Sequence, residues 1–414
     1  MAVLRAFKGI RPRKDLAKDV AALPYDVMNS SEAREMVKDK PYSFLHVDKA
    51  EIDLPENINI YDTKVYQKAD ENLQNMIDQG ILVQDNKPKL YIYRLIMKGR
   101  AQTGIVGVTS IDDYMNNIIK KHELTREEKE KDRINHVDFC NANTGPIFLT
   151  YRNNKRIDEI VKDLTFNPPE YTFIAEDSVA HLVWVIDDAA LIEEIVSIFK
   201  GVDYLYIADG HHRAASAVKV GLKRREENRN YTGDEEFNYF LSVLFPKDDL
   251  YIMDYNRVVK DLNGLSAEDF MDKIQRAFIL TACQDKSPYK PEEKHTFGMF
   301  LQGKWFKLKA KPGTYDENDE VNSLDVSILQ NNLLAPILGI GDPRLDKRID
   351  FIGGIRGLDE LEKRTREDMT VAFSMYPTSI DDLMRIADAK KVMPPKSTWF
   401  EPKLRSGLFI HKLK

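Results

Sequence analysis

The chain contains almost no cysteine. Its two cysteines, Cys140 and Cys283, are far apart among 414 residues, and no Cys-x-x-Cys pair occurs. A thiolate zinc site is therefore not expected. So few cysteines in so long a chain also indicate a reducing compartment.

Long apolar runs and a positive net charge are absent as well. The most apolar stretch, Val179 to Ile186, is short and runs into Asp187-Asp188, so no segment of the sequence is expected to span a membrane. The first residues contain no apolar signal core. The net charge of −6 argues against non-specific binding of nucleic acid, although a local basic groove stays possible. We expect a cytoplasmic protein that binds neither nucleic acid nor membrane.

The composition is that of a globular protein, with 43% hydrophobic and 31% charged residues. Helical and strand patterns alternate, with no internal repeat, which predicts an α+β fold of mixed β-sheets with flanking helices. Chain length favours two or three lobes. We expect an N-terminal α/β lobe (1–115), a core with a strand, turn and helix (116–265), and a C-terminal α/β lobe (266–414). Helices are expected near 61–79, 188–200, 211–222, 266–278, 324–338, 357–366 and 379–389, and strands near 90–97, 103–111, 202–208, 239–245 and 296–308.

The sequence Asp209-Gly210-His211-His212-Arg213 marks the most informative point of the chain. An apolar strand runs into a glycine and then into an alanine-rich helix. The first turn of a helix has unpaired N–H groups and a partial positive charge, and glycine lets a ligand approach its backbone closely. Arg213 adds a fork of donors suited to phosphate oxygens. This pattern predicts a phosphate site.

The same residues also have ordinary structural interpretations. Asp-Gly is a common turn, and an aspartate before a helix is a common N-cap. Asp209 is equally able to bind a metal ion or to accept a proton from a hydroxyl nucleophile, and His211 and His212 to stabilise phosphoryl charge or carry a proton. Adjacent helical residues point about 100° apart, so the His-His pair is a poor chelator of one metal.

Three further groups of residues carry suitable chemistry. Asp26 follows a Pro-Tyr turn, and His122 and Glu123 are typical acid–base residues within a charge-dense stretch that also fits a solvated surface. Lys396 lies in a Pro/Lys-rich stretch beside aromatic residues, where a packed tail is the alternative.

The order of these groups resembles a bacterial family called domain of unknown function 1015. Besides the Asp-Gly-His-His-Arg segment, the matching stretches are Arg11-Pro12, Ala22-Leu-Pro-Tyr-Asp-Val27, Tyr42-Ser-Phe-Leu-His-Val47, His122-Glu123-Leu-Thr125, Met393-Pro-Pro-Lys-Ser-Thr-Trp-Phe400, Pro402-Lys403 and Ser406-Gly407-Leu408.

The Asp-Gly-His-His-Arg segment also resembles the core of the ParB/sulfiredoxin-like superfamily, in which this helix start holds nucleotide phosphates. Sulfiredoxins need a cysteine where this chain has His211, which excludes their chemistry. ParB proteins add a DNA-binding helix-turn-helix that this sequence lacks. Kinases of free L-serine carry the same five residues and are the nearest functional analogue.

The resemblance implies a kinase that uses ATP or ADP with Mg²⁺ to phosphorylate a small hydroxyl compound, above all free L-serine. Its expected catalytic residues are Asp209, His211, His212 and Glu123; the nucleotide is expected on Gly210, His211, His212 and Arg213, the substrate on Asp26, His122 and Lys396, and the metal on Asp209. The alternatives are a nucleotide-binding regulator without transfer chemistry, or a phosphatase or nucleotide hydrolase. A pocket for a small zwitterion beside the phosphate would favour the kinase, with Arg94, Arg133 or Lys396 as the carboxylate-binding residue.

Overall fold

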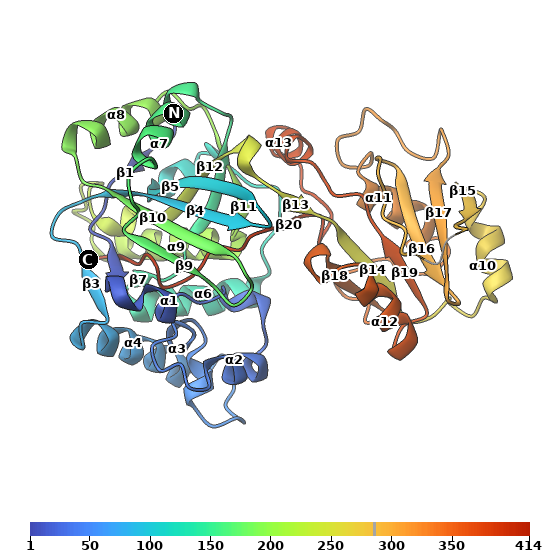
Figure 1. The fold of residues 1–414 in the computed structure, drawn as a ribbon, viewed down its shortest axis with the longest axis horizontal. Coiled ribbons are helices and arrows are strands. Elements are labelled where there is room, and N and C mark those ends of the chain that lie inside the picture. Colours follow the sequence, from blue (N-terminus) through green and yellow to red (C-terminus); the bar gives the residue numbers. More distant parts are fainter. Residues whose placement is uncertain (285–286) are drawn as a thin grey trace. The chain divides into compact units, whose positions relative to one another are not determined.

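The computed structural model describes residues 1–284 and 287–414, which divide into two compact units (Figure 1). The first unit comprises Met1–Leu250 and Pro402–Lys414, and the second comprises Tyr251–Glu401. The chain therefore leaves the first unit, forms the second, and returns. The first unit takes in the segment 1–115 and most of 116–265; the three-segment division remains a prediction.

The first unit is built on a mixed sheet. Two of its pairings are parallel, β6 with β11 and β8 with β12, and the others are antiparallel. In spatial order the strands are β6 (Ile119–Lys120), β11 (Leu205–Asp209), β8 (Ile147–Tyr151), β12 (Tyr239–Pro246), β5 (Arg100–Ser110), β4 (Leu90–Met97), β10 (Ala180–Ile186) and β9 (Tyr171–Ile174), with β1 (Leu4–Arg5) on β5.

The hairpin β4–β5 is the predicted one, and its turn shows why it forms. Lys98 and Gly99 both have positive φ, 50° and 79°. Such turns match the right-handed twist of two adjoining strands. Tyr91 and Tyr93 on one face, and Leu90 and Ile92 on the other, are fully buried. The sheet is therefore covered on both faces.

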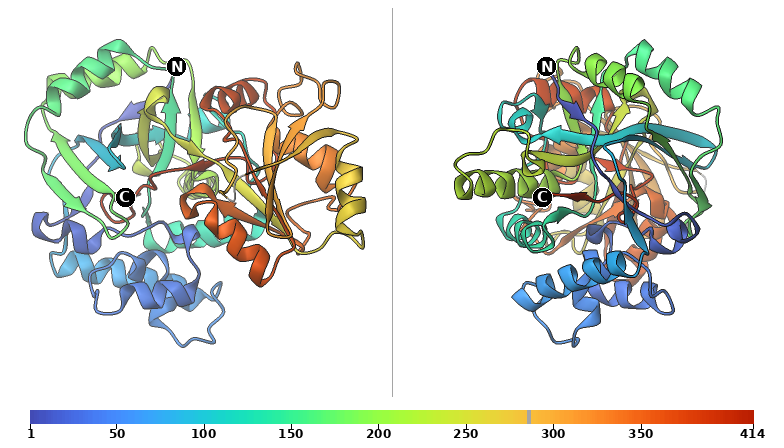
Figure 2. Two further views of the ribbon diagram at one scale, coloured as in Figure 1. Left: turned by 45° about the vertical axis from the view of Figure 1, so that its right-hand side comes forward. Right: turned by 90° about the vertical axis from the view of Figure 1, so that its left-hand side faces the viewer.

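Helices of the first unit cover this sheet. Apolar side chains of α7, α8 and α9 share one core with alternate strand residues, and a second core is formed by the N-terminal helices, which Figure 2 shows gathered on one side (blue). The helices are α1 (Ala17–Val20), α2 (Ser30–Val37), α3 (Leu45–Asp48), α4 (Thr63–Asp78), α5 (Ile111–Met115), α6 (Glu127–Cys140), α7 (Lys155–Leu164), α8 (Ala189–Phe199) and α9 (His211–Glu227), with 3-10 turns at Lys14–Leu16, Tyr25–Val27, Ala50–Asp53, Glu236–Asn238 and Lys247–Asp249.

The charge-dense stretch around 120–135 is only partly the solvated surface that its composition favours. Lys120 ends β6, a loop follows up to Arg126, and α6 begins at Glu127. Glu130, Arg133 and His136 are buried on one face of α6, where each finds a partner of opposite charge or a hydrogen bond. Composition alone does not reveal which charges pair, and the partner of Glu130, Lys219, is distant in sequence.

The last residues of the chain, which follow the Pro/Lys-rich stretch, are packed. After the second unit, Leu404, Leu408 and Phe409 are buried in the first unit, and β21 (His411–Lys412) pairs with β7 (Ala142–Asn143). A further small pairing joins β2 (Ile10–Pro12) to β3 (Leu82–Gln84). This return brings the C-terminal lysines and arginines beside the central sheet.

The second unit contains an antiparallel sheet with flanking helices. The sheet includes the predicted hairpin, which turns at Gln302-Gly303. The helix predicted at 266–278 ends at Ile274, and Phe278 already belongs to a strand. The strands are β15 (Phe278–Ala282), β17 (Lys304–Ala310), β16 (Thr296–Leu301), β19 (Val371–Ser374), β14 (Tyr255–Val259) and β18 (Ile349–Gly353), with β13 (Ile252–Met253) on β20 (Trp399–Phe400); the helices are α10 (Ala267–Ile274), α11 (Asp325–Leu329) with a π-turn at Gln330–Leu334, α12 (Asp359–Glu367) and α13 (Ile380–Asp388), and a 3-10 turn lies at Gly354–Arg356.

The predicted fold class, α+β with mixed sheets and flanking helices, is confirmed. Within residues 1–284 and 287–414, no helix combines the length and the apolar character needed to cross a bilayer.

Candidate functional site

The predicted strand, turn and helix are present at Asp209–Arg213. Strand β11 ends at Asp209 and α9 begins at His211. Between them Gly210 has φ of 93°, a conformation that side chains disfavour, and an added Cβ would lie 3.1 Å from Nε of Arg213. Gly210 has no side chain to cap the helix, so the first-turn N–H groups remain suited to an anion.

Asp209 anchors this turn through two cations. Its carboxylate lies 3.2 Å from Nη2 of Arg213 and 3.7 Å from Nζ of Lys403. Burial acts to raise the pKa of Asp209, but Lys403 and Arg213 outweigh it and leave the pKa below its usual value. A carboxylate held ionised in this way is a weak proton acceptor. Its geometry therefore suits an anchor better than a base.

Arg213 is folded back over the turn. Its Nη1 donates to the carbonyl of Pro146 at 2.5 Å, and Nη2 donates to Asp209. Its buried Nε has no hydrogen-bond partner within the part of the chain that the structure describes. A buried donor without a partner is costly, which makes this N–H a candidate contact for a phosphate oxygen.

His122 and Glu123 reach the turn by strand pairing. Strand β6 pairs in parallel with β11, with Ile119 opposite Leu205 and Lys120 opposite Tyr206. Because parallel strands run in the same direction with a constant register, the residues that follow Lys120 lie beside the end of β11. Glu123 Oε2 consequently lies 3.9 Å from Nδ1 of His211.

His122 and His211 form a buried pair of neutral imidazoles. Their rings meet edge to face with centroids 4.5 Å apart. Burial lowers the pKa of His122 to about 4 and that of His211 well below its usual value. Nε2 of His211 lacks a hydrogen-bond partner among the described residues and is available to a ligand. His122 interacts with the backbone of Ile207, which opposes part of the effect of burial on its pKa.

His122, His211 and the neighbouring Glu123 together form a candidate metal site. The ligand atoms of His122, Glu123 and His211 lie within 4.8 Å of one another. The sequence pointed instead to Asp209 as metal ligand, and Asp209 is not one of these three. Imidazoles favour Zn²⁺ and related metals, whereas Mg²⁺ prefers oxygen ligands.

His212 joins two helices rather than entering this cluster. Its Nε2 accepts the backbone N–H of Arg126, at the start of α6, at 3.1 Å. Burial lowers its pKa, an effect that Asp26 opposes. Asp26 is exposed on the 3-10 turn Tyr25–Val27, near enough to influence His212 electrostatically.

Two lysines from the end of the chain differ in placement. Lys396, expected to bind substrate, belongs to the second unit, where its ammonium lies 5.5 Å from the Tyr255 ring; its substrate contact remains a prediction. Lys403, which sequence reasoning did not assign, reaches Asp209. Only the return of the chain into the first unit brings Lys403 there, and no local pattern signals that return.

A family profile described as "Protein of unknown function (DUF1015)" matches residues 4–327. The chain belongs to this family. No curated protein matches the sequence.

Several solved structures are similar to the chain. A glutamate-to-alanine mutant of a free serine kinase in complex with AMP is 13% identical, covering 77% of this chain and 94% of that one, with a TM-score of 0.41. A conserved hypothetical protein from Pyrococcus furiosus is 14% identical, covering 76% and 97%, with a TM-score of 0.37. C-terminally truncated SbnI from Staphylococcus aureus is 9% identical, covering 74% and 87%, with a TM-score of 0.39.

Proposed function

We propose that this protein is a nucleotide-dependent kinase that phosphorylates a small hydroxyl compound, with free L-serine as the first substrate to test. One observation carries the proposal. A half-exposed carboxylate, that of Glu123, lies 3.9 Å from His211 at the uncapped start of the helix that follows Gly210. Phosphoryl transfer depends mainly on positioning and charge neutralisation, and this arrangement supplies both.

The phosphates of ATP or ADP are assigned to the start of α9. Its first-turn N–H groups and the unpartnered Nε of Arg213 offer donors to phosphate oxygens. His211 and His122 lie beside them as neutral imidazoles, which donate hydrogen bonds without competing for a proton. Mg²⁺ would be held chiefly by the phosphates, as hard cations prefer oxygen ligands.

Glu123 is the preferred general base. The Glu123 side chain is 43% exposed, so a substrate can reach it, and the cations beside Asp209 make the Asp209 carboxylate the weaker proton acceptor. Glu123 takes the proton of the hydroxyl group as its oxygen attacks the terminal phosphorus. The bond from that phosphorus to the bridging oxygen breaks, and the shortened nucleotide leaves with the electron pair.

The test compares two glutamates in an assay for O-phosphoserine from L-serine, Mg²⁺ and ATP or ADP. We expect Glu123→Gln to reduce the rate by roughly a hundredfold or more, the usual range for a general base. Glu127→Gln is the matched control, because Glu127 is exposed on the first turn of α6. Equal rates for both variants would contradict the assignment of Glu123.

A second candidate is favoured by the cluster of His122, Glu123 and His211. Two imidazoles and a carboxylate are a common ligand set for a catalytic metal that activates water. A phosphate monoester would then be hydrolysed at the start of α9. Release of phosphate from O-phosphoserine that requires Zn²⁺ or Mn²⁺ would support this hydrolase instead of the kinase.

A further inference from the structure

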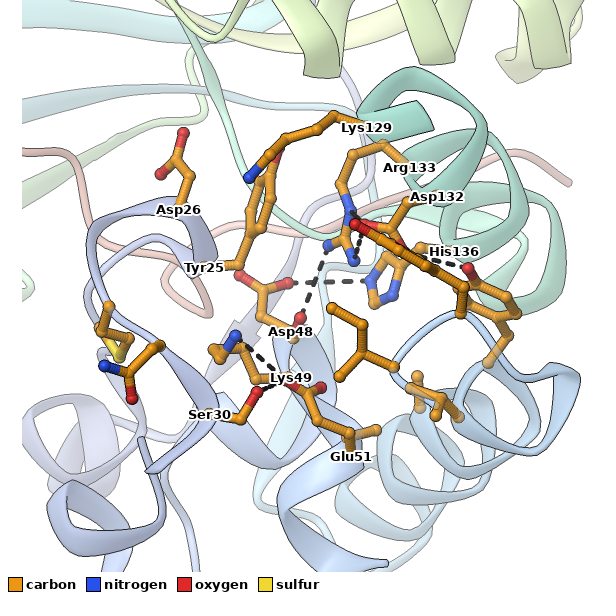
Figure 3. Close-up of a pocket in the computed structure, with 18 residues that line it drawn as sticks. Tyr25, Asp26, Ser30, Asp48, Lys49, Glu51, Lys129, Asp132, Arg133 and His136 are labelled. Carbon is orange, nitrogen blue, oxygen red and sulfur yellow. Dashed lines mark hydrogen bonds and ion pairs between the residues drawn. The ribbon is translucent and has the colours of Figure 1, made fainter. Parts of the chain in front are cut away.

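The first unit contains a cavity of about 310 Å³ to which the proposed function assigns no role (Figure 3). Helices α2, α4 and α6 and the turns at Tyr25–Val27 and Ala50–Asp53 surround it. At roughly 30 Å³ for each water-sized group, it has room for a molecule of about ten heavy atoms. That is the size of a free amino acid.

Charges of both signs line this cavity. Inside it, Lys49 pairs with Glu51 at 3.0 Å and Arg133 pairs with Asp132 at 2.9 Å. Asp48 is buried there too, and burial raises its pKa. A ligand with a large negative charge, such as a nucleotide phosphate, would meet these carboxylates and be repelled. The mixed charges suit a ligand that has both signs.

Arg133 is fixed at the inner wall. Its guanidinium lies 4.1 Å from the centre of the Tyr25 ring, and it donates to Asp132 and to the carbonyl of Asp48. Tyr66 donates to the same Asp132 at 3.0 Å and so holds the pair in place. A guanidinium has five N–H donors, and these contacts leave some unused within the described residues.

Asp26 and Lys129 supply two further charges at the edge of the cavity. Both are exposed, line the cavity, and lie on the same side of it next to Tyr25 (Figure 3). Neither makes a hydrogen bond or ion pair with any described residue. An exposed acid and an exposed base that do not pair with each other can receive an ammonium and a carboxylate group.

The cavity adjoins the start of α9. A narrower cavity shares Tyr25, Asp48 and Arg133 with it and is also lined by Arg213. A molecule in the cavity would therefore lie next to the assigned phosphate position.

We propose that this cavity binds a free α-amino acid in its zwitterionic form. Lys129 and Arg133 take the carboxylate, and Asp26 takes the ammonium group. The apolar wall formed by Ile60, Val65 and Ala69 limits the rest of the molecule to an uncharged side chain. The role of this amino acid as phosphoryl acceptor rests on the proposed function, whereas its binding does not.

Binding is tested on the full chain without nucleotide, so that the result does not depend on catalysis. The free amino acids are screened by thermal shift, and hits are measured by calorimetry. For L-serine, the matched probes are ethanolamine, which lacks the carboxylate, and 3-hydroxypropionate, which lacks the ammonium group. We expect L-serine or another uncharged amino acid to bind and both truncated probes to fail. No binding by any amino acid, or equal binding of a truncated probe, would overturn the proposal.

Variants locate the site. We expect Lys129→Gln and Asp26→Asn each to weaken amino-acid binding about tenfold or more, as lost charged hydrogen bonds do. Both residues are exposed, so the fold should persist. Lys131→Gln is the control, since Lys131 is exposed on the same helix and does not line the cavity. Equal affinities for all three variants would place the amino acid elsewhere. Binding without phosphorylation would preserve this site and refute the kinase.

Discussion

His122 and His211 come from distant parts of the chain, yet their rings meet edge to face at 4.5 Å and both are buried. The parallel pairing of β6 with β11 brings them together. Burying an imidazole nitrogen is unfavourable where, as at Nε2 of His211, it has no hydrogen-bond partner in the part of the chain that the structure describes. A ligand bound at the start of α9 would offset this cost in stability, which supports our proposal that the functional site lies there.

The neutral state of His122 gives stability a pH dependence. Its pKa is lowered by burial to about 4, while an unfolded histidine titrates near 6.5. Between these values the unfolded chain binds a proton that the folded chain does not, so stability falls as the pH falls through that window. We expect His122 to contribute a loss of up to about 3 kcal/mol by pH 4.

Urea unfolding of the native chain and of His122→Gln, measured between about pH 7 and pH 5, checks this expectation. The variant should show the shallower decline in unfolding free energy. Parallel curves for the two proteins would mean that folding leaves the pKa of His122 unchanged, which contradicts the expectation.

Gly210 should tolerate no side chain. In Gly210→Ala the residue would keep φ of 93° and its Cβ would crowd Arg213, so we expect a loss of about 1–3 kcal/mol and weaker nucleotide binding. Gly233→Ala is the control, because Gly233 has φ of 100° but nothing within 4 Å of an added Cβ. Urea unfolding and AMP titration of both variants separate backbone strain from crowding. A Gly210 variant with normal AMP affinity would argue against phosphate at this turn.

Lys403 should control the charge state of Asp209. Removing its ammonium in Lys403→Met takes away the first of the two cations that lower the pKa of Asp209, so that pKa should rise. Carboxyl-carbon NMR measures the shift directly. Lys403→Arg should restore the low value, and Lys412→Met, on β21 of the same C-terminal stretch, should leave it unchanged. An unshifted Asp209 in Lys403→Met would show that Arg213 alone holds the carboxylate.

Metal dependence separates the two candidate functions. For the kinase, chelation should stop the reaction and Mg²⁺ alone should restore it, because the metal travels with the nucleotide. For the hydrolase, Zn²⁺ or Mn²⁺ should be required, and His211→Gln should abolish its binding. His46→Gln is the control, since His46 pairs with Asp53 at 2.8 Å outside the cluster. Tight Zn²⁺ binding that survives His211→Gln would exclude the cluster as the metal site.

Much of the fold was predictable because local patterns determine it. The hairpin β4–β5 and the sequence β11–Gly210–α9 follow from alternation, turn residues and glycine placement, which act over a few positions. The burial of α6 was missed because Glu130 is neutralised by Lys219, a partner 89 residues away that sequence spacing does not reveal.

The types of residue in the site could be predicted from the sequence, but their arrangement in space could not. The residues of the turn and Glu123 stand out by type, whereas their roles depend on neighbours supplied by the fold. Lys403 engages Asp209 only because the chain returns from the second unit, and Arg133 lines a cavity only because α6 packs against α4. Long-range pairing of this kind carries no local signal.

The most direct test uses a nucleotide with a radioactive terminal phosphate. It is incubated with the full chain, Mg²⁺ and L-serine, and the products that carry the radioactive label are identified. The account predicts label in O-phosphoserine, formed by the native chain and lost in Glu123→Gln. Label that appears only as inorganic phosphate, or that stays on a bound nucleotide, would contradict it and favour the hydrolase or the nucleotide-binding regulator, respectively.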